Sequence, residues 1–302
     1  MPAQRTLSDW ALLMALVAMW GSAFLFIKLG VATVPPMTLV AARLVLGVAV
    51  LLPLVYMRGL RLPPFGATWY PFILLALLGN AIPFYLITWG QQTVPSALAG
   101  ILMAAMPLAT MVLAHFTVAG EHMTRNRVLG FALGFLGIMS LMGPAALGGL
   151  GGSSLDVLAQ LAILAGALCY AANSVLTRRL VKSEFLVSAT AMLLVASVVV
   201  VPVALVIDRP WELAPSAPSI LSILWLGVGP TAVATICYFQ LISSAGPTFM
   251  SIVNYLSPCI AVALGVALLG EEPGASAYAG LALILAGIAI SQLGRRQHAP
   301  KA

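Results

Sequence analysis

Two basic residues, Lys28 and Arg43, lie inside long apolar runs, where an ionisable side chain often marks the pathway of a substrate or an ion. Lys28 is near the end of its run, and Arg43 is about six residues into the next one, or ~9 Å along a helix. Both are shallow enough to extend their charges to the surface of the apolar layer. Arg43 has a second interpretation, a bond to a carbonyl at a broken helix. The functional interpretation of both residues is attraction of a substrate carboxylate.

The acidic residues avoid such positions, because all eight fall at or near the ends of apolar runs. Their absence from the middle counts against proton coupling through a buried carboxylate and against a strongly cationic substrate. The simplest interpretation of Glu121, Glu271 and Glu272 is that they end helices in water. His115 lies near the end of another run, where packing or an interfacial position is more usual than a proton relay.

Cofactor and enzyme chemistry is not predicted. The cysteines Cys169, Cys237 and Cys259 lie inside apolar runs and form no C-x-x-C pair, so they indicate packing rather than a metal site or a disulfide framework. The sequence has no G-x-x-x-x-G-K-[ST] phosphate-binding loop and no cluster of His, Asp or Cys at one depth. We therefore expect neither an enzyme, nor an ATP-driven pump, nor a cofactor.

The composition explains why reactive residues are so few. The chain has 302 residues, of which 62% are hydrophobic and 7% charged, and its mean hydropathy is +1.08. A soluble domain carries ~25% charged residues, so this chain cannot cover a soluble surface. Its apolar runs of ~20 residues have the length that a helix needs to cross a bilayer. The net charge of +6 comes from short connections and does not indicate binding to nucleic acid.

An all-α polytopic membrane protein with ten transmembrane helices is predicted. The first run, which begins at Trp10, is longer than the apolar core of ~7–15 residues in a secretory signal peptide, so we interpret it as the first span. The expected spans are 10–31, 37–57, 69–91, 96–119, 126–143, 156–178, 186–207, 218–242, 247–269 and 275–293.

The distribution of charge predicts the orientation of the chain. If the N-terminus is cytoplasmic, eleven of the fourteen Lys and Arg residues fall on the cytoplasmic side, and Arg209 alone falls outside. Positive residues favour cytoplasmic connections. Both termini are therefore predicted to be inside the cell, which requires an even number of spans.

Motifs recur at an interval of about 150 residues and predict a duplicated fold. The matched pairs are Pro107 with Pro258, Glu121 with Glu272, Gly130 with Gly280, and Gly137 with Gly287. The predicted copies are 1–143 and 155–302, joined by a Gly-rich external linker at 144–154. Because each copy has five spans, the second enters the membrane from the opposite side. Secondary transporters use this inverted arrangement.

Polar and aromatic side chains within the spans are predicted to line a central cavity between the copies. An unpaired buried amide costs several kcal/mol in hydrocarbon, so Asn173 and Asn254 are expected to face protein or water. For the aromatic residues packing is an equally open interpretation, and Trp69, Tyr70 and Trp225 better fit an interfacial belt. The predicted lining residues are Trp20, Asn80, Tyr85, Trp89, Met103, Met106, Tyr170, Asn173, Tyr238, Asn254 and Tyr255.

Pro107 and Pro258 are predicted to act as hinges. Each removes a backbone donor in mid-span, which gives either a static kink or a hinge that closes one end of the fourth or ninth span over the cavity. We expect rocking between inward-open and outward-open states, with the third and fourth spans gating one side and the eighth and ninth the other. Gly130, Gly134 and Gly137 lie on one side of the fifth span and indicate close helix packing or a dimer contact.

Together these features resemble the drug/metabolite transporter superfamily, in its ten-span branch built from two EamA repeats. The resemblance is carried by Trp20-Gly-Ser-Ala-Phe with Lys28, by Arg43, by Gly79 before an aromatic-rich span, by Pro107 before Gly120-Glu121, and by Leu269-Gly-Glu-Glu. Within the superfamily the chain is most similar to YddG-type exporters of aromatic amino acids. The resemblance implies a central cavity, alternating access, small organic substrates and a bacterial inner membrane. The chain departs from the four-span multidrug relatives, which have a glutamate within the membrane.

We therefore expect a secondary transporter that exports small metabolites, with aromatic or other neutral amino acids as the leading cargo. The alternatives are another cargo in the same fold, such as a sugar, a nucleotide-sugar or a drug, and a membrane protein that does not transport. The expected partners are a small-molecule substrate and the lipid bilayer, and not nucleic acid. A monomer and a homodimer both stay open.

Overall fold

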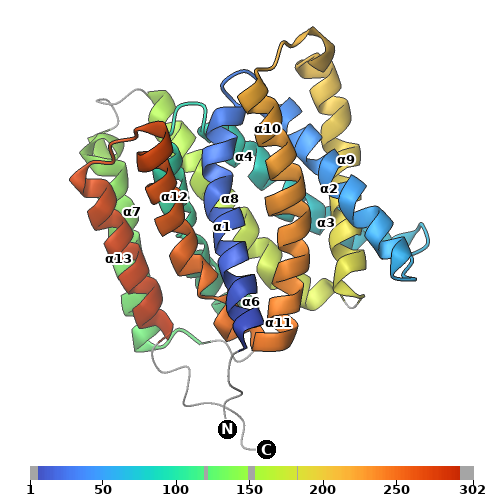
Figure 1. Cartoon of the computed structure of the whole chain (residues 1–302). Helices are drawn as coiled ribbons and strands as arrows, with labels where there is room; N and C mark the ends of the chain where they lie inside the picture. Colours follow the sequence, from blue (N-terminus) through green and yellow to red (C-terminus); the bar gives the residue numbers. More distant parts are fainter. Residues whose placement is uncertain (1–5, 119–121, 149–153, 182, 293–302) are drawn as a thin grey trace, which may run out of the picture.

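The fold is a bundle of helices that run between two ends of the molecule (Figure 1). This computed structural model describes residues 6–118, 122–148, 154–181 and 183–292, and within these ranges the regular structure is entirely helical. Eight helical segments of the described chain are long and apolar enough to cross a membrane, and α12 is a shorter apolar helix. The all-α membrane fold predicted from composition is thus confirmed for these residues.

The predicted spans lie close to the observed helices, because a membrane helix begins and ends where an apolar run meets polar or Gly/Pro connections. Caps specify some ends: Thr6 and Asp9 form a capping box at the start of α1, and Pro36 begins α2. The α-helices are α1 (Leu7–Gly30), α2 (Pro36–Met57), α3 (Tyr70–Ala76), α4 (Ile82–Gly90), α5 (Ser96–Met103), α6 (Met106–Thr117), α7 (Arg125–Gly148), α8 (Ser154–Leu180), α9 (Phe185–Ile207), α10 (Ala217–Leu226), α11 (Ala234–Met250), α12 (Val253–Leu269) and α13 (Ala275–Gln292).

Four of the predicted spans are interrupted. A π-helical segment, η2 (Leu77–Ala81), joins α3 to α4, and a second one, η4 (Gly227–Val233), joins α10 to α11. Such π segments frequently occur at functional sites. The span predicted at 96–119 divides into α5 and α6, and the span predicted at 247–269 is broken just before α12. Interruptions therefore occur in corresponding elements of the two halves of the chain.

The Gly-rich linker predicted at 144–154 is partly helical. Helix α7 continues to Gly148, and α8 starts at Ser154. The alanines and the leucine that follow the predicted edge of the fifth span favour helix and explain the extension. Residues 149–153 lie outside the described residues, as does Glu121, one of the matched residues of the predicted repeat.

Helices α7 and α13 form a close pair at one edge of the bundle (Figure 1). A Cβ atom added at Gly130 would collide with the carbonyl of Gly287, and one added at Gly137 would lie 2.8 Å from the carbonyl oxygen of Gly280. Only glycine permits backbones to approach so closely. The packing interpretation of these glycines is confirmed. The crossed pairing, in which the first glycine of one helix meets the last of the other, is the pattern that a twofold axis produces.

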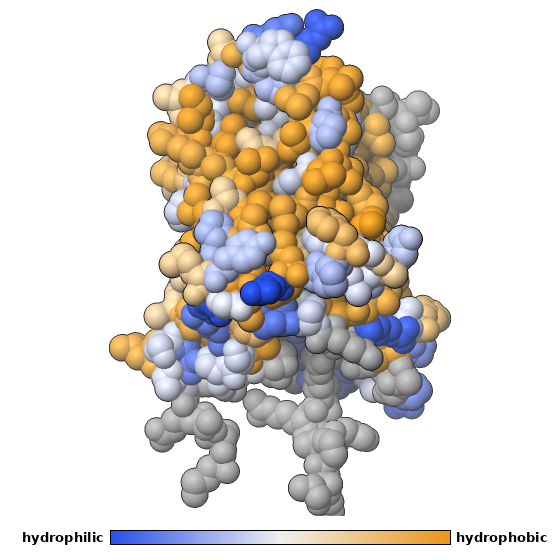
Figure 2. All heavy atoms as spheres, turned by 90° about the vertical axis from the view of Figure 1, so that its right-hand side faces the viewer, coloured by the Kyte–Doolittle hydropathy of each residue, from blue (hydrophilic) through white to orange (hydrophobic). Residues whose placement is uncertain are grey.

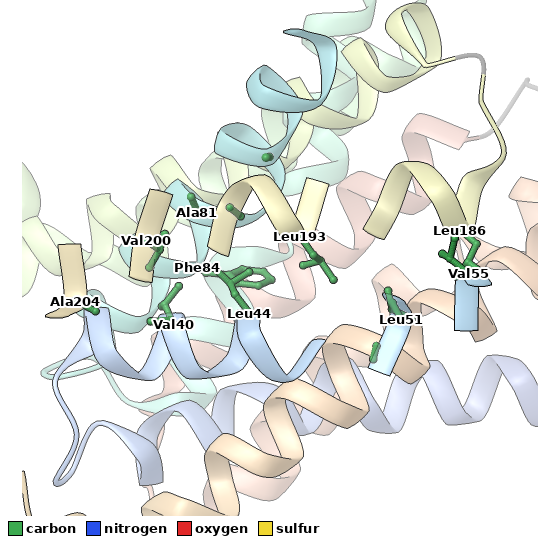
Figure 3. Close-up of a cluster of buried hydrophobic side chains, with 14 of the residues drawn as sticks. Val40, Leu44, Leu51, Val55, Ala81, Phe84, Leu186, Leu193, Val200 and Ala204 are labelled. Carbon is green, nitrogen blue, oxygen red and sulfur yellow. The ribbon is translucent and has the colours of Figure 1, made fainter. Parts of the chain in front are cut away.

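Helices α2 and α9 pack together on the other side of the bundle. Val40 and Leu44 from α2, Phe84 from α4 and Val200 from α9 belong to one buried cluster, in which the Phe84 ring lies beside Leu44 (Figure 3). Inside a bilayer such a cluster is stabilised by van der Waals contact rather than by exclusion of water. The cluster holds Phe84 against α2 at the level of Arg43, the residue before Leu44.

The surface of the molecule carries an apolar band. Figure 2 shows hydrophobic residues across the middle of one face and hydrophilic residues toward its upper and lower ends. Helix α1 begins and α13 ends at the same end of the bundle, at the bottom of Figure 1, which we call the N/C end. The connections α1–α2, α4–α5, α9–α10 and α12–α13 lie at the opposite end, which we call the far end.

Candidate functional site

Arg43 lies in the interior of the bundle. Its side chain is 7% exposed, and its Nε donates a 2.7 Å hydrogen bond to Thr231 Oγ1. Its guanidinium carbon lies 3.8 Å from the centre of the Phe84 ring, and the Tyr170 ring lies 6.4 Å from that ring. Within the described ranges no Asp or Glu forms an ion pair with it. The interpretation in which Arg43 extends its charge to the membrane surface is therefore wrong.

The interrupted span around η4 explains how Thr231 holds Arg43. Pro230 has no amide hydrogen, so it cannot bond to the carbonyl four residues earlier, on Leu226. Thr231 Oγ1 donates a 2.7 Å hydrogen bond to that carbonyl and accepts the bond from Arg43 Nε. One hydroxyl thus links α2, in the first half of the chain, to the eighth span, in the second half.

Two tryptophans attach α1 to the same span. Trp20 Nε1 donates a 3.3 Å hydrogen bond to the carbonyl of Pro230, and its ring lies 5.8 Å from the ring of Tyr238. Two of the predicted lining residues therefore meet. Trp225 Nε1 donates a 3.1 Å hydrogen bond to Ser22 Oγ on α1. Its polar group thus bonds within the bundle, although the side chain is 39% exposed, and the interfacial-belt interpretation of Trp225 stays a prediction.

Lys28 ties α1 to the connection between α4 and α5 at the far end. Its Nζ donates hydrogen bonds of 2.9, 3.2 and 3.2 Å to the carbonyls of Gln91, Gln92 and Val94, respectively. The Gln91 side chain returns to α1 through a 2.9 Å bond from Nε2 to the carbonyl of Phe24. These bonds hold the ammonium group within the protein. The side chain is half-buried at this end of the molecule, which agrees with the surface position suggested by the sequence, and its contact with a substrate stays a prediction.

Glu271 caps α5 from the other half of the chain. Its two carboxylate oxygens accept hydrogen bonds of 2.7 and 2.8 Å from the backbone amides of Ser96 and Ala97. A carboxylate at a helix N-terminus satisfies amides that have no partner within the helix and interacts favourably with the helix dipole. The neighbouring Glu272 is exposed. The prediction that Glu271 simply ends a helix in water is therefore wrong.

All eleven predicted lining residues are half-buried. Met103 and Tyr170 pack against one buried cluster that includes residues of α1. Trp89, Met103 and Tyr255 pack against a neighbouring cluster formed mainly by α5, α8 and α13. Met103 packs against both clusters. It therefore lies between the groups that contain Trp89 on α4, Tyr170 on α8 and Tyr255 on α12.

The remaining lining residues are not joined to these groups by polar contacts. Asn173 Oδ1 is buried without a hydrogen-bond partner among the described residues, and the side chain lies against Gly79 in η2, where an added Cβ would be 2.8 Å from the amide carbon. The side chains of the others make neither hydrogen bonds nor ring contacts in the described part of the chain; they are Asn80, Tyr85, Met106 and Asn254. Their place in a cavity stays a prediction.

The two predicted hinge prolines have different settings. Pro107 is in the first turn of α6, directly after the break between Met103 and Met106, where a helix does not need the missing amide donor. Pro258 is buried inside α12, where the missing donor frees a carbonyl. Hinge motion at either residue stays a prediction.

Neither Phe84 as a site residue nor the contact of Thr231 with Arg43 is predicted from the sequence. A signal was present, because Phe84 follows Pro83 and Thr231 follows Pro230. Both prolines mark interrupted spans, and an interruption within a membrane is tolerated where protein surrounds it. The residue after a mid-span proline is therefore a reasonable candidate for an interior contact.

Known proteins share the duplicated layout described above. The EamA-like transporter family matches residues 9–143 and, a second time, residues 157–292. The chain belongs to the EamA-like transporter family. The members and relatives of this family are transporters or exporters, so the protein is a transporter and not an enzyme. With its apolar helices, this EamA-like transporter is a multi-pass protein of a bacterial inner membrane.

Relatives of this EamA-like transporter align over almost its whole length. The uncharacterized inner membrane transporter YedA of Escherichia coli strain K12 is 26% identical, over 94% of this chain and 90% of its own. A probable terminal-alkyne amino-acid exporter of Streptantibioticus cattleyicolor is 27% identical over 96% of both chains, and a probable amino-acid metabolite efflux pump of Escherichia coli strain K12 is 23% identical over 95% and 96%. A solved crystal structure, 23% identical, covers 97% of this chain and 99% of its own with a TM-score of 0.68, so the fold is shared.

Proposed function

We propose that this EamA-like transporter exports neutral amino acids, aromatic ones foremost, by alternating access. The relatives named for amino-acid export and for amino-acid metabolite efflux support this cargo. The interior supports it as well, because it offers one buried cation at Arg43 and aromatic rings at Trp20 and Tyr170. A zwitterion with an apolar side chain matches those features.

We propose ten spans in two inverted copies, 1–143 and 155–302, joined by an external linker at 144–154. The shared position of the start of α1 and the end of α13 supports an even number of spans (Figure 1). The basic residues in or beside the described connections support a cytoplasmic N/C end. The connections at that end have Arg58, Arg61, Arg125, Arg127 and Arg179 in or beside them, whereas the far end has Arg209 and Lys28.

The observation that carries the proposal is the pair of hydrogen bonds by which Glu271 joins the two halves of the chain at the far end. Glu271, in the second half, caps α5, in the first half. Within the first half, Lys28 fixes the connection that precedes α5. Toward the N/C end, α6 continues the same span with Leu108 as its one buried residue, and all of α6 is described. We interpret this as an inward-open state, in which the half-buried lining residues face the cytoplasm.

Counterflow in proteoliposomes tests the cargo. Vesicles loaded with unlabelled phenylalanine should accumulate labelled phenylalanine well above the leak of protein-free vesicles, and the same assay run across the neutral amino acids should rank the substrates. Repeating it with and without a pH gradient tests proton coupling. Uptake no greater than leak for every amino acid would overturn the cargo. Accumulation of a sugar or drug by the same vesicles would then favour the alternative cargo.

A further inference from the structure

We propose that Arg43 binds the carboxylate group of the transported amino acid. This inference rests on the proposed function and extends it, because it assigns the recognition of one chemical group to one residue. The site would take compounds that carry a carboxylate and would discriminate against amides and amines of the same size and shape.

The buried charge of Arg43 is incompletely paired. The Arg43 side chain is 93% buried, given its exposure of 7%, and its one hydrogen bond among the described residues uses Nε. A guanidinium has five N–H donors, so both terminal amino groups are left for another acceptor. A buried cation without an anionic partner is unfavourable in a membrane interior. A bound carboxylate supplies the missing charge.

The orientation of the Arg43 guanidinium also favours a carboxylate partner. The Phe84 ring covers one face of the guanidinium at 3.8 Å, and Thr231 Oγ1 fixes the Nε edge at 2.7 Å. The plane of the group is thereby held, and the terminal amino groups make no hydrogen bond to the described residues. A carboxylate binds such a group through two parallel hydrogen bonds.

Arg43 also lies where the two halves of the chain meet. Arg43 comes from α2, whereas Thr231 comes from the π segment η4 in the other half of the chain. Tyr170, on α8, lies beside Phe84 and adds an aromatic surface next to the charge. The group therefore lies between the two halves of the chain, where relative motion of the halves would change its surroundings. Inverted-repeat transporters bind their substrates at such an interface.

The test compares phenylalanine with phenylalaninamide and phenethylamine, which keep the ring but lack the carboxylate. In counterflow competition, wild-type protein should prefer phenylalanine to both analogues at least tenfold. The Arg43→Gln variant should lose most of its response to phenylalanine and keep its response to the analogues, so that the preference falls to about twofold or less. An arginine that serves packing alone would lower all three responses together, and that result would overturn the inference.

Two further variants keep the test decisive if Arg43→Gln fails to fold. Arg43→Lys keeps the charge but not the planar, two-donor edge, and it should show a preference between those of the wild type and of Arg43→Gln. Thr231→Val keeps the arginine and removes the hydroxyl that orients it, and it should lower the preference for phenylalanine over phenethylamine. Wild-type preference in both variants would overturn the inference. A wild-type protein that moves no amino acid would instead overturn the proposed function, and the inference with it.

Discussion

Helices α5 and α6 are the two parts of one membrane span, yet α5 is mostly buried and α6 is mostly half-buried. In α5, six of the eight residues are buried, and the N-terminus is capped by Glu271. In α6, which is fully described, Leu108 is the one buried residue of twelve. Gly100 brings α5 so close to α12 that an added Cβ would collide with Ala261. No glycine occurs in α6.

This difference indicates which contacts hold the far end closed. Helix α5 has its main neighbours in α12, α8 and α1, whereas α6 has its main neighbours in α8 and α7. The contacts of α5 with α12 join the two halves of the chain, and they are supplemented by the polar bonds of Glu271 and Lys28. If the far end opens during transport, these bonds must break, so substitutions there should have larger effects than substitutions in α6.

The largest effect is expected for Glu271→Gln. The amide keeps the size of the side chain but loses the negative charge, and hydrogen bonds to a charged group contribute roughly 1.5–3 kcal/mol each. We expect counterflow to fall at least tenfold because the closed state loses its cap. The matched control is Glu272→Gln, which makes the same change at an exposed neighbour and should keep the wild-type rate. Equal losses in the two variants would contradict the role of the cap.

The next largest effect is expected for Gly100→Val, which forces a branched side chain into the contact between α5 and Ala261. Overpacking of this kind costs roughly 1–3 kcal/mol. We expect a lower unfolding temperature and less monodisperse protein in detergent, measured by size-exclusion chromatography after heating. Ala114→Val adds similar bulk to the half-buried α6 and should be tolerated. If Ala114→Val were the more damaging change, the contrast between α5 and α6 would be wrong.

A smaller effect is expected for Lys28→Met, which removes the three hydrogen bonds to the connection before α5. The carbonyls lie at the end of the molecule, where water can replace part of what they lose. We expect a several-fold loss of counterflow. Lys28→Arg keeps the charge and the donors and should recover most of the rate. If Lys28→Arg folds normally but does not recover the rate, the carbonyl contacts of Lys28 do not determine the transport rate.

The smallest effects are expected at the prolines. Alanine at Pro107 lets α5 and α6 join into one helix, and alanine at Pro258 restores an amide donor inside α12. We expect each variant to change the maximal transport rate by about twofold to threefold with little change in the half-saturating concentration. Concentration series in proteoliposomes measure both quantities. Unchanged rates in both variants would count against the hinge role.

The sequence predicts the helices well because apolar runs and their boundaries are local features. It also predicts a close helix contact along α7, because glycines at a regular interval mark such an interface, but it does not identify α13 as the partner. The role of Glu271 is less accessible, since Glu271 and Glu272 look alike in the sequence. Their difference comes from Gly270, whose φ of 62° ends α12, while the amide of Glu271 bonds to the carbonyl of Gly265. This turn directs one glutamate toward α5.

The surroundings of Arg43 are inaccessible from sequence for another reason. Its partner Thr231 lies 188 residues away along the chain, so no periodic pattern connects the two. The π segment that presents Thr231 depends on packing against α2, and local propensity does not specify it. The second span is therefore predicted correctly as the place of Arg43, but the burial of its side chain between helices is not.

The most direct test of the account is the accessibility of a single cysteine at Met103, the last residue of α5. The variant Met103→Cys is made in a protein whose native cysteines are replaced, and it is exposed to a membrane-impermeant thiol reagent from either side. With the far end closed, we predict fast labelling from the cytoplasmic side and little from outside. Addition of Glu271→Gln should accelerate labelling from outside, whereas Glu272→Gln should not. Fast labelling from outside with Glu271 intact, or no acceleration in Glu271→Gln, would contradict the account.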